Sequence, residues 1–213
     1  MKALILTTLA ILILIGVGLF ISSSSAAATE KPDYTIETTD GDFEIRSYPS
    51  MLLAEVTVDG DRRNANNQGF RKLAAFIFGD NVAQDKVAMT SPVVTKPASA
   101  KIAMTSPVVS APTATGRWTV NFMMPSEYTR ETLPVPTDPD IRIFESEPYR
   151  TVSIRFNGAY KTKNIAQHEA ELMKYVKEKG LAVVGNPEYA GYDAPWVPNP
   201  MKRNEVHFRL AAN

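Results

Sequence analysis

The chain contains no cysteine, and only two of its 213 residues are histidines, His168 and His207. Disulfide bonds, thiolate nucleophiles and cysteine ligands to a metal are therefore excluded. A metal site built from several histidines of one chain is not expected either. The sequence also lacks the G-x-S-x-G, H-E-x-x-H and phosphate-loop motifs that indicate common classes of enzyme. These absences favour a protein that is not an enzyme.

An excess of charge of one sign is missing as well. The 23 lysines and arginines balance 23 aspartates and glutamates, which gives a formal net charge of zero at pH 7. Proteins that bind nucleic acid normally carry a basic field, so we do not expect a nucleic-acid partner. The composition, with 44% hydrophobic and 22% charged residues, is typical of a globular protein and leaves the oligomeric state open.

The longest uncharged run stands at the N-terminus. Lys2 precedes an uncharged, mostly apolar run over residues 3–21, and serines and alanines follow it. This order is typical of a secretory signal, although the run exceeds the usual ~7–15 residues and approaches the ~20 residues of a membrane-spanning helix. We expect residues 1–29 to be a signal peptide or a membrane anchor. Residues 30–213 would then form an exported domain, either secreted into the periplasm or another extracytoplasmic space or attached to the membrane through residues 3–21.

Strand and helix patterns alternate along the rest of the chain. Apolar alternation predicts strands, and 3.6-residue periodicity ended by glycine predicts two helices. The expected strands cover residues 34–48 with a hairpin turn, 51–58, 118–122, 141–145, 151–158 and 204–210, and the helices cover 66–79 and 164–180. A strand, a helix and further strands therefore occur twice. The order predicts an α+β fold in which a curved, mainly antiparallel sheet carries two helices, with a cleft for a small ligand between the halves.

One nine-residue string occurs twice. KVAMTSPVV covers residues 86–94 and KIAMTSPVV covers residues 101–109. The short proline-containing connector between them allows the copies to pair as an antiparallel hairpin. Alternation along that hairpin would place Met89 and Met104 in the core. The alternative is that one of these thioethers packs against a flat apolar ligand.

Several uncommon strings follow one another between residues 34 and 210. They are GFRKLAAFIFGDN, the two K-x-A-M-T-S-P-V segments, ETLPVP and GYDAPWVPNPMKRNEV. In this order they resemble the SOUL haem-binding protein family. The resemblance implies a distorted antiparallel β-barrel with two packed helices, built from two pseudo-symmetric βαββ halves. It also implies non-covalent binding of haem or a related tetrapyrrole on an apolar surface near the first helix.

Such a surface needs an apolar wall and cations for two propionates. We expect a slot between the first helix and the loop that precedes the last strand. The candidate side chains are Arg71, Lys72 and Phe76 on the helix, Met89 and Met104 in the repeated segments, and Tyr192, Trp196, Val197, Lys202 and Arg203 in the loop. Alternatives stay open for three of them: Phe76 packed under a neighbouring loop, Lys202 on the solvated surface, and Arg203 in an ion pair with Glu205.

The iron ligand is left open by the sequence. The candidates are Met89, Met104 and His168. His168 flanks the apolar stripe of the second helix, which favours packing over ligation. His207 shares a strand face with Glu205 and Arg209, which favours a polar surface or the lining of the barrel.

Two other functions are compatible with the same residues. One is a binding module for other amphipathic molecules in a cleft of the effector-binding type, where Glu205 would be the acid that meets a cation. The other is an enzyme that uses haem for redox or degradation chemistry.

Overall fold

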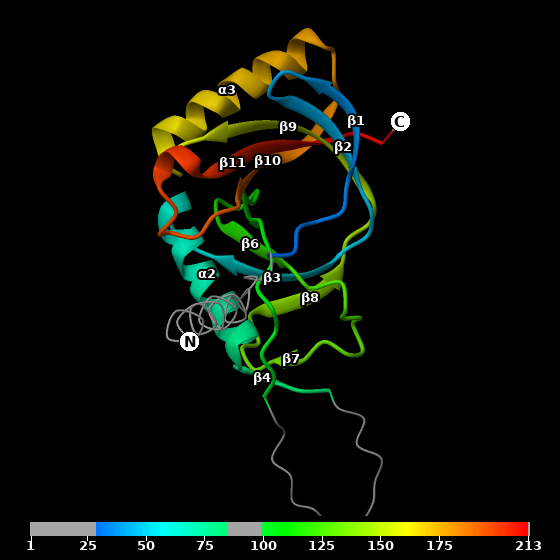
Figure 1. Ribbon diagram of the computed structural model, residues 1–213, viewed down its shortest axis with the longest axis vertical. Helices are drawn as coiled ribbons and strands as arrows, with labels where there is room; N and C mark the ends of the chain where they lie inside the picture. The colour runs from blue at the N-terminus through cyan, green and yellow to red at the C-terminus, as the bar shows by residue number, and fades with distance from the viewer. Residues whose placement is uncertain (1–28, 85–98, 213) are drawn as a thin grey trace, which may run out of the picture.

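The computed structural model describes residues 29–84 and 99–212 (Figure 1). Within these residues the structure has two long helices and eleven strands. The helices are α2 (Arg62–Phe78) and α3 (Thr162–Glu178), and a short 3-10 helix, η1, covers Asn199–Met201. The strands are β1 (Thr35–Asp40), β2 (Phe43–Tyr48), β3 (Leu52–Val58), β4 (Asn81–Val82), β5 (Val108–Pro112), β6 (Trp118–Met123), β7 (Val135–Pro136), β8 (Ile141–Glu145), β9 (Tyr149–Asn157), β10 (Val183–Gly191) and β11 (Arg203–Leu210).

Nine of the strands form one sheet in the order β1-β2-β9-β11-β10-β5-β6-β3-β8. Every pairing in this sheet is antiparallel, and β1 and β8 are its two edges, so the barrel-like sheet is not closed. The order β9-β11-β10 in one half mirrors β5-β6-β3 in the other. With α3 and α2 these strands form the two βαββ halves that the sequence predicts, and the α+β fold class is confirmed.

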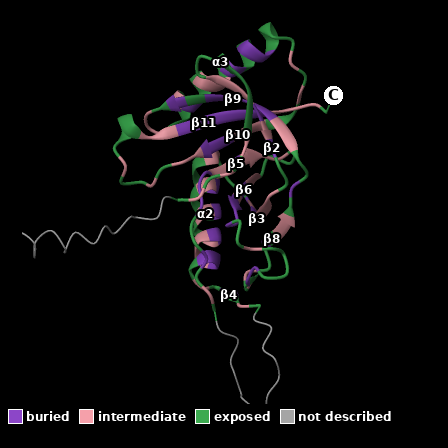
Figure 2. Cartoon of the chain, turned by 45° about the vertical axis from the view of Figure 1, so that its right-hand side comes forward, coloured by how far each residue is buried: buried purple, intermediate pink, exposed green. Residues whose placement is uncertain are grey.

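Each helix covers the outer face of its own half (Figure 1). Alternation along β11 places Val206 and Phe208 against α3, in a cluster of buried side chains that also includes Leu172. In the other half, Val120 of β6 packs with Leu73 of α2. Figure 2 shows the buried residues concentrated in the strands and where the helices meet them. The inner face of the curved sheet carries a mixture of polar and apolar side chains.

The first helix begins four residues earlier than the periodicity predicts. Asp61 caps it, since a carboxylate oxygen of Asp61 accepts a hydrogen bond of 2.9 Å from the backbone N–H of Asn64. The predicted C-terminal cap is correct: Gly79 has φ of 130°, a conformation that side chains rarely adopt.

Close packing of α2 on the sheet depends on Gly69. A Cβ atom at this position would lie 2.4 Å from Cγ2 of Val120. Overlap of that size forces the helix away from the strand. The lack of a side chain at Gly69 therefore sets how near α2 lies to β6.

Strand β10 was not expected, because Glu188–Gly191 falls in a stretch that the sequence predicts as a loop. Tyr189 and Ala190 are buried there and pair with both β11 and β5. The register between Val184 and Glu188 is irregular, which accommodates the glycine and the proline of this strand.

The repeated string is only partly within the described residues. The first copy and its predicted pairing with the second lie outside them. In the second copy Ile102 is buried, Thr105 donates a hydrogen bond of 2.5 Å to the carbonyl of Met123, and the strand starts only at Val108. Met104 is 38% exposed, so its predicted burial in the core is wrong. The strand alternation that would have turned it inward is absent before Val108.

Candidate functional site

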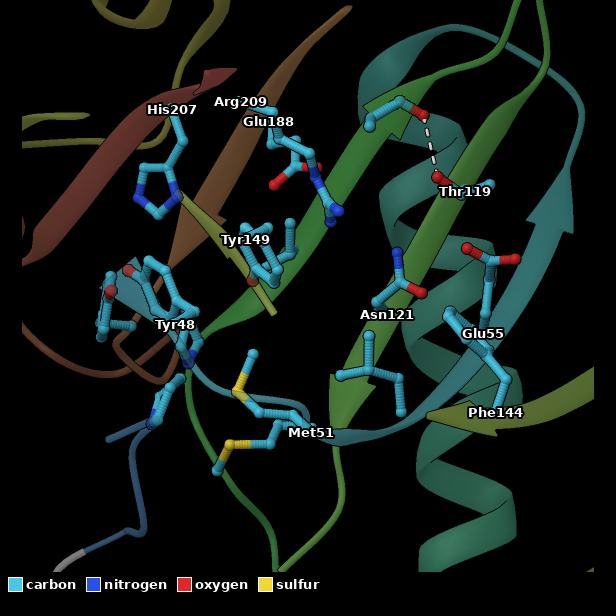
Figure 3. Close-up of a pocket in the computed structure, with 17 residues that line it drawn as sticks. Tyr48, Met51, Glu55, Thr119, Asn121, Phe144, Tyr149, Glu188, His207 and Arg209 are labelled. Atoms are coloured by element: carbon cyan, nitrogen blue, oxygen red, sulfur yellow. Dashed lines mark hydrogen bonds and ion pairs between the residues drawn. The ribbon is translucent and has the colours of Figure 1, made fainter. Parts of the chain in front are cut away.

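A cleft opens on the inner face of the curved sheet. Its volume is about 140 Å³. The lining side chains come from both halves and alternate along the strands, so that every second residue faces the cleft (Figure 3). They are Pro32, Tyr48, Met51, Leu53, Glu55, Pro107, Val109, Ala111, Thr119, Asn121, Met123, Phe144, Tyr149, Glu188, Tyr192, His207 and Arg209.

Two carboxylates lie in the wall of this cleft. Glu188 accepts a hydrogen bond of 2.7 Å from Nε of Arg209, whose guanidinium lies 4.0 Å from the centre of the Tyr149 ring. Glu55 accepts a hydrogen bond of 2.7 Å from Arg142, a side chain that is 63% exposed. Each carboxylate is therefore paired with an arginine, and the guanidinium of Arg142 also lies 4.1 Å from the centre of the Phe144 ring in the cleft wall.

The phenols of the cleft are neutral at physiological pH. Burial raises the pKa of Tyr48 to about 12, against the opposing effect of the Arg46 guanidinium. Burial and the nearby Glu188 carboxylate raise the pKa of Tyr149 as well. The two rings stack with their centres 5.0 Å apart, so they form an uncharged aromatic wall.

Beside the cleft lies a buried ionic cluster centred on Glu205, whose side chain is 0% exposed. Two Arg46 nitrogens donate to its oxygens at 2.6 and 3.1 Å. Two Arg203 nitrogens donate at 2.9 and 2.6 Å. The Tyr192 hydroxyl donates at 2.9 Å, and Nε2 of His207 lies 2.7 Å from the carboxylate.

Glu205 is ionised in this cluster. Burial by itself would raise the pKa of its carboxyl, but the hydrogen bonds from His207 and Arg46 outweigh that effect and hold the pKa well below the ordinary value of 4.5. These hydrogen-bond partners occupy the space around both carboxylate oxygens of Glu205. Glu205 is therefore not open to a ligand cation, and the ion pair with Arg203 that the sequence allowed is present.

The helix residues of the predicted slot do not form an apolar face. Phe76 is 1% exposed and belongs to the core, where it packs in one cluster with Ile102 and Leu133. The expectation that its ring lies on a second, ligand-facing surface is wrong, because those distant segments cover it. Lys72 bonds to Asp138 at 2.8 Å and to Asp140 at 2.7 Å, while Arg71 is exposed.

The loop residues of the predicted slot divide into two groups. Tyr192 and Arg203 turn towards Glu205, and Arg203 lies 4.0 Å over the Tyr192 ring. Trp196 is 85% exposed, Val197 is half-buried, and Nζ of Lys202 donates to the carbonyl of Pro195 at 3.3 Å. The structure does not bring the nine predicted residues that it describes together in one slot.

The remaining candidates are His168 and the two methionines of the repeated string. His168 stacks on Phe156 with ring centres 4.0 Å apart, and its Nδ1 lies 2.7 Å from the carbonyl oxygen of Asn164, as a packing role predicts. Met104 is partly exposed, and Met89 lies outside the described residues. Among residues 29–84 and 99–212 no group of three His, Asp or Glu side chains could hold a metal ion.

The sequence reading missed most of the cleft, although a signal for it was present. Period-two alternation in MLLAEVTV, RWTVNFMMP and NEVHFRL assigns Glu55, Asn121 and His207 to the face opposite the apolar core. Met201, 72% exposed beside the Trp196 loop, was also missed.

Comparison with known proteins agrees with the strings found in the sequence. The model of a family described as SOUL heme-binding protein matches residues 29–209. Heme-binding protein 1 of Xenopus laevis is 29% identical over 170 residues, which cover 78% of this chain and 82% of that protein. Heme-binding protein 2 of Homo sapiens is 28% identical over 171 residues, which cover 78% and 77%.

The solved C-terminal domain of EcmrR has the same fold. It superposes with a TM-score of 0.56 at 9% sequence identity, over 84% of this chain and 99% of that domain. At this level of identity the likeness concerns the fold alone.

Proposed function

This chain belongs to the SOUL heme-binding protein family, and we propose that it binds haem or a related tetrapyrrole non-covalently, as a transporter, buffer or scavenger without catalysis. The observation that carries the proposal is the family match over residues 29–209, nearly the whole described chain. The relatives named heme-binding protein 1 and 2 support it, since each matches over about four fifths of its own length.

The surface that fits a porphyrin best is the outer one near the Trp196 loop. The cleft, at about 140 Å³, is smaller than the ~300–1,000 Å³ of pockets for larger organic ligands. The exposed side chains of Trp196 and Met201 offer apolar area instead. Helix α2, whose N-terminal end lies near this loop in Figure 1, contains Arg71 and other basic residues but no acidic one.

Apolar contact supplies most of the binding free energy on such a surface. Covering about 60 Å² of the Trp196 ring yields ~1.5 kcal/mol at ~25 cal/mol per Å². Arg71 and Lys202 would orient the propionates, and each exposed charge pair contributes only ~0–1 kcal/mol. Haem itself would supply an absorbing iron centre, which reports binding through the Soret band.

Replacing Trp196 by serine is expected to weaken haemin binding about tenfold, because the largest exposed apolar contact is removed. The measurement is a haemin titration followed at the Soret band. Met173→Ser is the matched control, since Met173 is a 45% exposed apolar residue on α3, the other helix. It should leave the affinity unchanged.

Two results would contradict this location. One is equal affinity of the Trp196→Ser variant and the native chain. The other is loss of the Soret band in His168→Ala or His207→Ala while the fold survives, which would assign the site to an iron ligand away from the Trp196 loop.

We also propose that the domain acts outside the cytoplasm. The support is the apolar run over residues 3–21, which lies outside the described residues. In the part of the chain that the structure describes, no helix is long and apolar enough to cross a membrane. Protease added to cells with a permeabilised outer layer should digest the domain, whereas protection until the cells are lysed would reject export.

A further inference from the structure

We propose that the Trp196 loop, residues 192–202 between β10 and β11, docks on the surface of a lipid bilayer, with Trp196 and Met201 at the level of the headgroups. The bilayer is the one in which the apolar run over residues 3–21 would lie as an anchor. The proposal goes beyond haem binding and needs no bound haem. Three features lead to it: an exposed apolar tip on a rigid loop, cations beside the loop, and the place where the described chain begins.

The tip of the loop is apolar and carries no charge. Residues 194–201 read APWVPNPM, and the side chains of Trp196 and Met201 are 85% and 72% exposed. In Figure 2 this segment projects as an exposed stretch beyond the end of β11. Apolar groups exposed together indicate a binding surface. Tryptophan is enriched at membrane interfaces, because its ring is apolar while its N–H group stays hydrated.

The backbone of the loop holds these side chains outward. The N–H groups of Val197, Met201 and Lys202 each donate to the carbonyl three residues earlier, at 3.1, 2.9 and 3.1 Å. Three prolines between residues 195 and 200 restrict the backbone further, since proline fixes φ. A rigid loop loses little conformational entropy when it binds. The exposure of Trp196 is therefore built into the fold.

Cations lie beside the loop. Arg62 at the start of α2 donates a hydrogen bond of 3.2 Å to the Thr162 hydroxyl at the start of α3, so the two helix N-termini meet. Helix η1 of the loop lies beside β9, the strand that leads into α3. The basic side chains of the loop and these two termini are Arg62, Arg63, Lys161, Lys163 and Lys202, of which Arg63, Lys161 and Lys163 are exposed.

Fewer acids accompany these five cations. Asp59, Asp61 and Asp193 lie close to them in the sequence. The carboxylates of Asp61 and Asp193 accept hydrogen bonds from backbone N–H groups, at 2.9 and 2.5 Å. The net positive charge of this region is complementary to anionic lipid headgroups.

The described chain begins at the same end of the sheet. Val108 pairs with Gly191, the last residue before the loop. Because these strands are antiparallel, the residues before Val108 and those after Gly191 leave the sheet at one end. There the N–H of Ser106 donates to the carbonyl of Glu30 at 2.9 Å. Residues 22–28 span at most about 25 Å when extended, so an anchor in residues 3–21 would hold this end of the domain close to the bilayer.

Quenching by brominated lipid tests the contact, with the full chain and without haem. The vesicles contain phosphatidylcholine and phosphatidylglycerol with bromine on the acyl chains. The emission of Trp196 is the difference between the native chain and Trp196→Phe, since both contain Trp118, the second of the two tryptophans. This emission should fall by about half relative to unbrominated vesicles, because interfacial side chains reach ~5–10 Å into the boundary of headgroups and acyl chains. Unchanged emission would overturn the proposal.

Val184 gives the matched control. It is 47% exposed and lies at the opposite end of β10 from the loop. In a chain that combines Val184→Trp with Trp196→Phe, bromine should not quench the introduced indole. Equal quenching at positions 184 and 196 would overturn the proposal, because the domain would then have no fixed face towards the lipid.

Two further results separate docking from its alternatives. A blue shift of the Trp196 emission that grows with protein concentration in the absence of lipid would assign the loop to a second copy of the chain and overturn the proposal. The haemin titration of Trp196→Ser is independent of lipid. Quenching by lipid without any effect of Trp196→Ser on haemin affinity would therefore support docking and reject the haem surface, and the reverse pattern would do the opposite.

Discussion

Replacing Glu205 by glutamine is expected to lower the free energy of unfolding by about 3–5 kcal/mol, the range for removing one partner of a buried ion pair. The reason is the buried positive charge that the substitution leaves without its partner. Arg46 is 1% exposed, and without the carboxylate its guanidinium is a buried charge whose one remaining anionic partner among the described residues is Glu44. Arg203 and His207 lose the same partner.

The effect of this substitution should depend on pH. The pKa of Glu205 in the folded chain lies well below 4.5, so its contribution to stability is complete above the pKa of the unfolded chain and is lost as the pH falls below it. The slope is about 1.4 kcal/mol for each pH unit. The difference between the native chain and the Glu205→Gln variant should therefore be largest near pH 7 and shrink below about pH 4.

Urea denaturation at pH 7 and at pH 3.5 measures both effects. Glu37→Gln is a suitable control, because Glu37 forms a surface ion pair with Arg150 and such pairs contribute only ~0–1 kcal/mol. Adding Arg46→Met to Glu205→Gln should recover part of the loss, since it removes an unpaired buried cation. A loss below ~1 kcal/mol at pH 7 would show that the cluster tolerates an uncharged centre.

Replacing Phe76 by alanine is expected to cost about 3–5 kcal/mol of stability, as is usual for a fully buried aromatic side chain. Phe76 is 1% exposed, so the core would lose the packing of its whole ring. Phe78 is the matched control. It lies two residues further along the same helix, is 58% exposed, and its replacement by alanine should change stability by no more than ~0.5 kcal/mol.

The same pair of variants separates core packing from ligand contact. Thermal or urea denaturation of the chain without haemin gives the stability of each. If the Phe76→Ala variant is as stable as the native chain but binds haemin more weakly, the ring of Phe76 contacts the ligand and is not needed for the core. Loss of stability in Phe76→Ala alone agrees with the structure.

Local sequence patterns were enough to predict most of the architecture. Apolar alternation and glycine-ended helices predicted both helices and most of the long strands, because these signals depend on neighbours a few residues away. Strand β10 escaped this reading, since glycine and proline lower strand propensity and its pairing with β5 is a long-range contact. The burial of Phe76 depends on Ile102 and Leu133, which periodicity within α2 cannot reveal.

The polar sites show the same division. Alternation along β11 assigns Glu205 and His207 to one face. The ion pair between Arg203 and Glu205 could also be predicted from the sequence. The partner that buries the charge, Arg46, stands 159 residues earlier in the chain. The cleft likewise joins residues from both halves, so its acids and aromatic side chains became one site only when the strand order was known.

The join between the two halves has a mechanical consequence. Strands β10 and β5 are paired over three residues only, Tyr189–Ser110, Ala190–Val109 and Gly191–Val108, whereas β9 and β11 are paired over seven. A short ladder yields to a peeling force before a long one, because fewer hydrogen bonds share the load. The cleft bridges this join, with His207 and Glu188 on one side and Asn121 and Glu55 on the other (Figure 3). A small rotation about the β10–β5 join would thus change the width of the cleft.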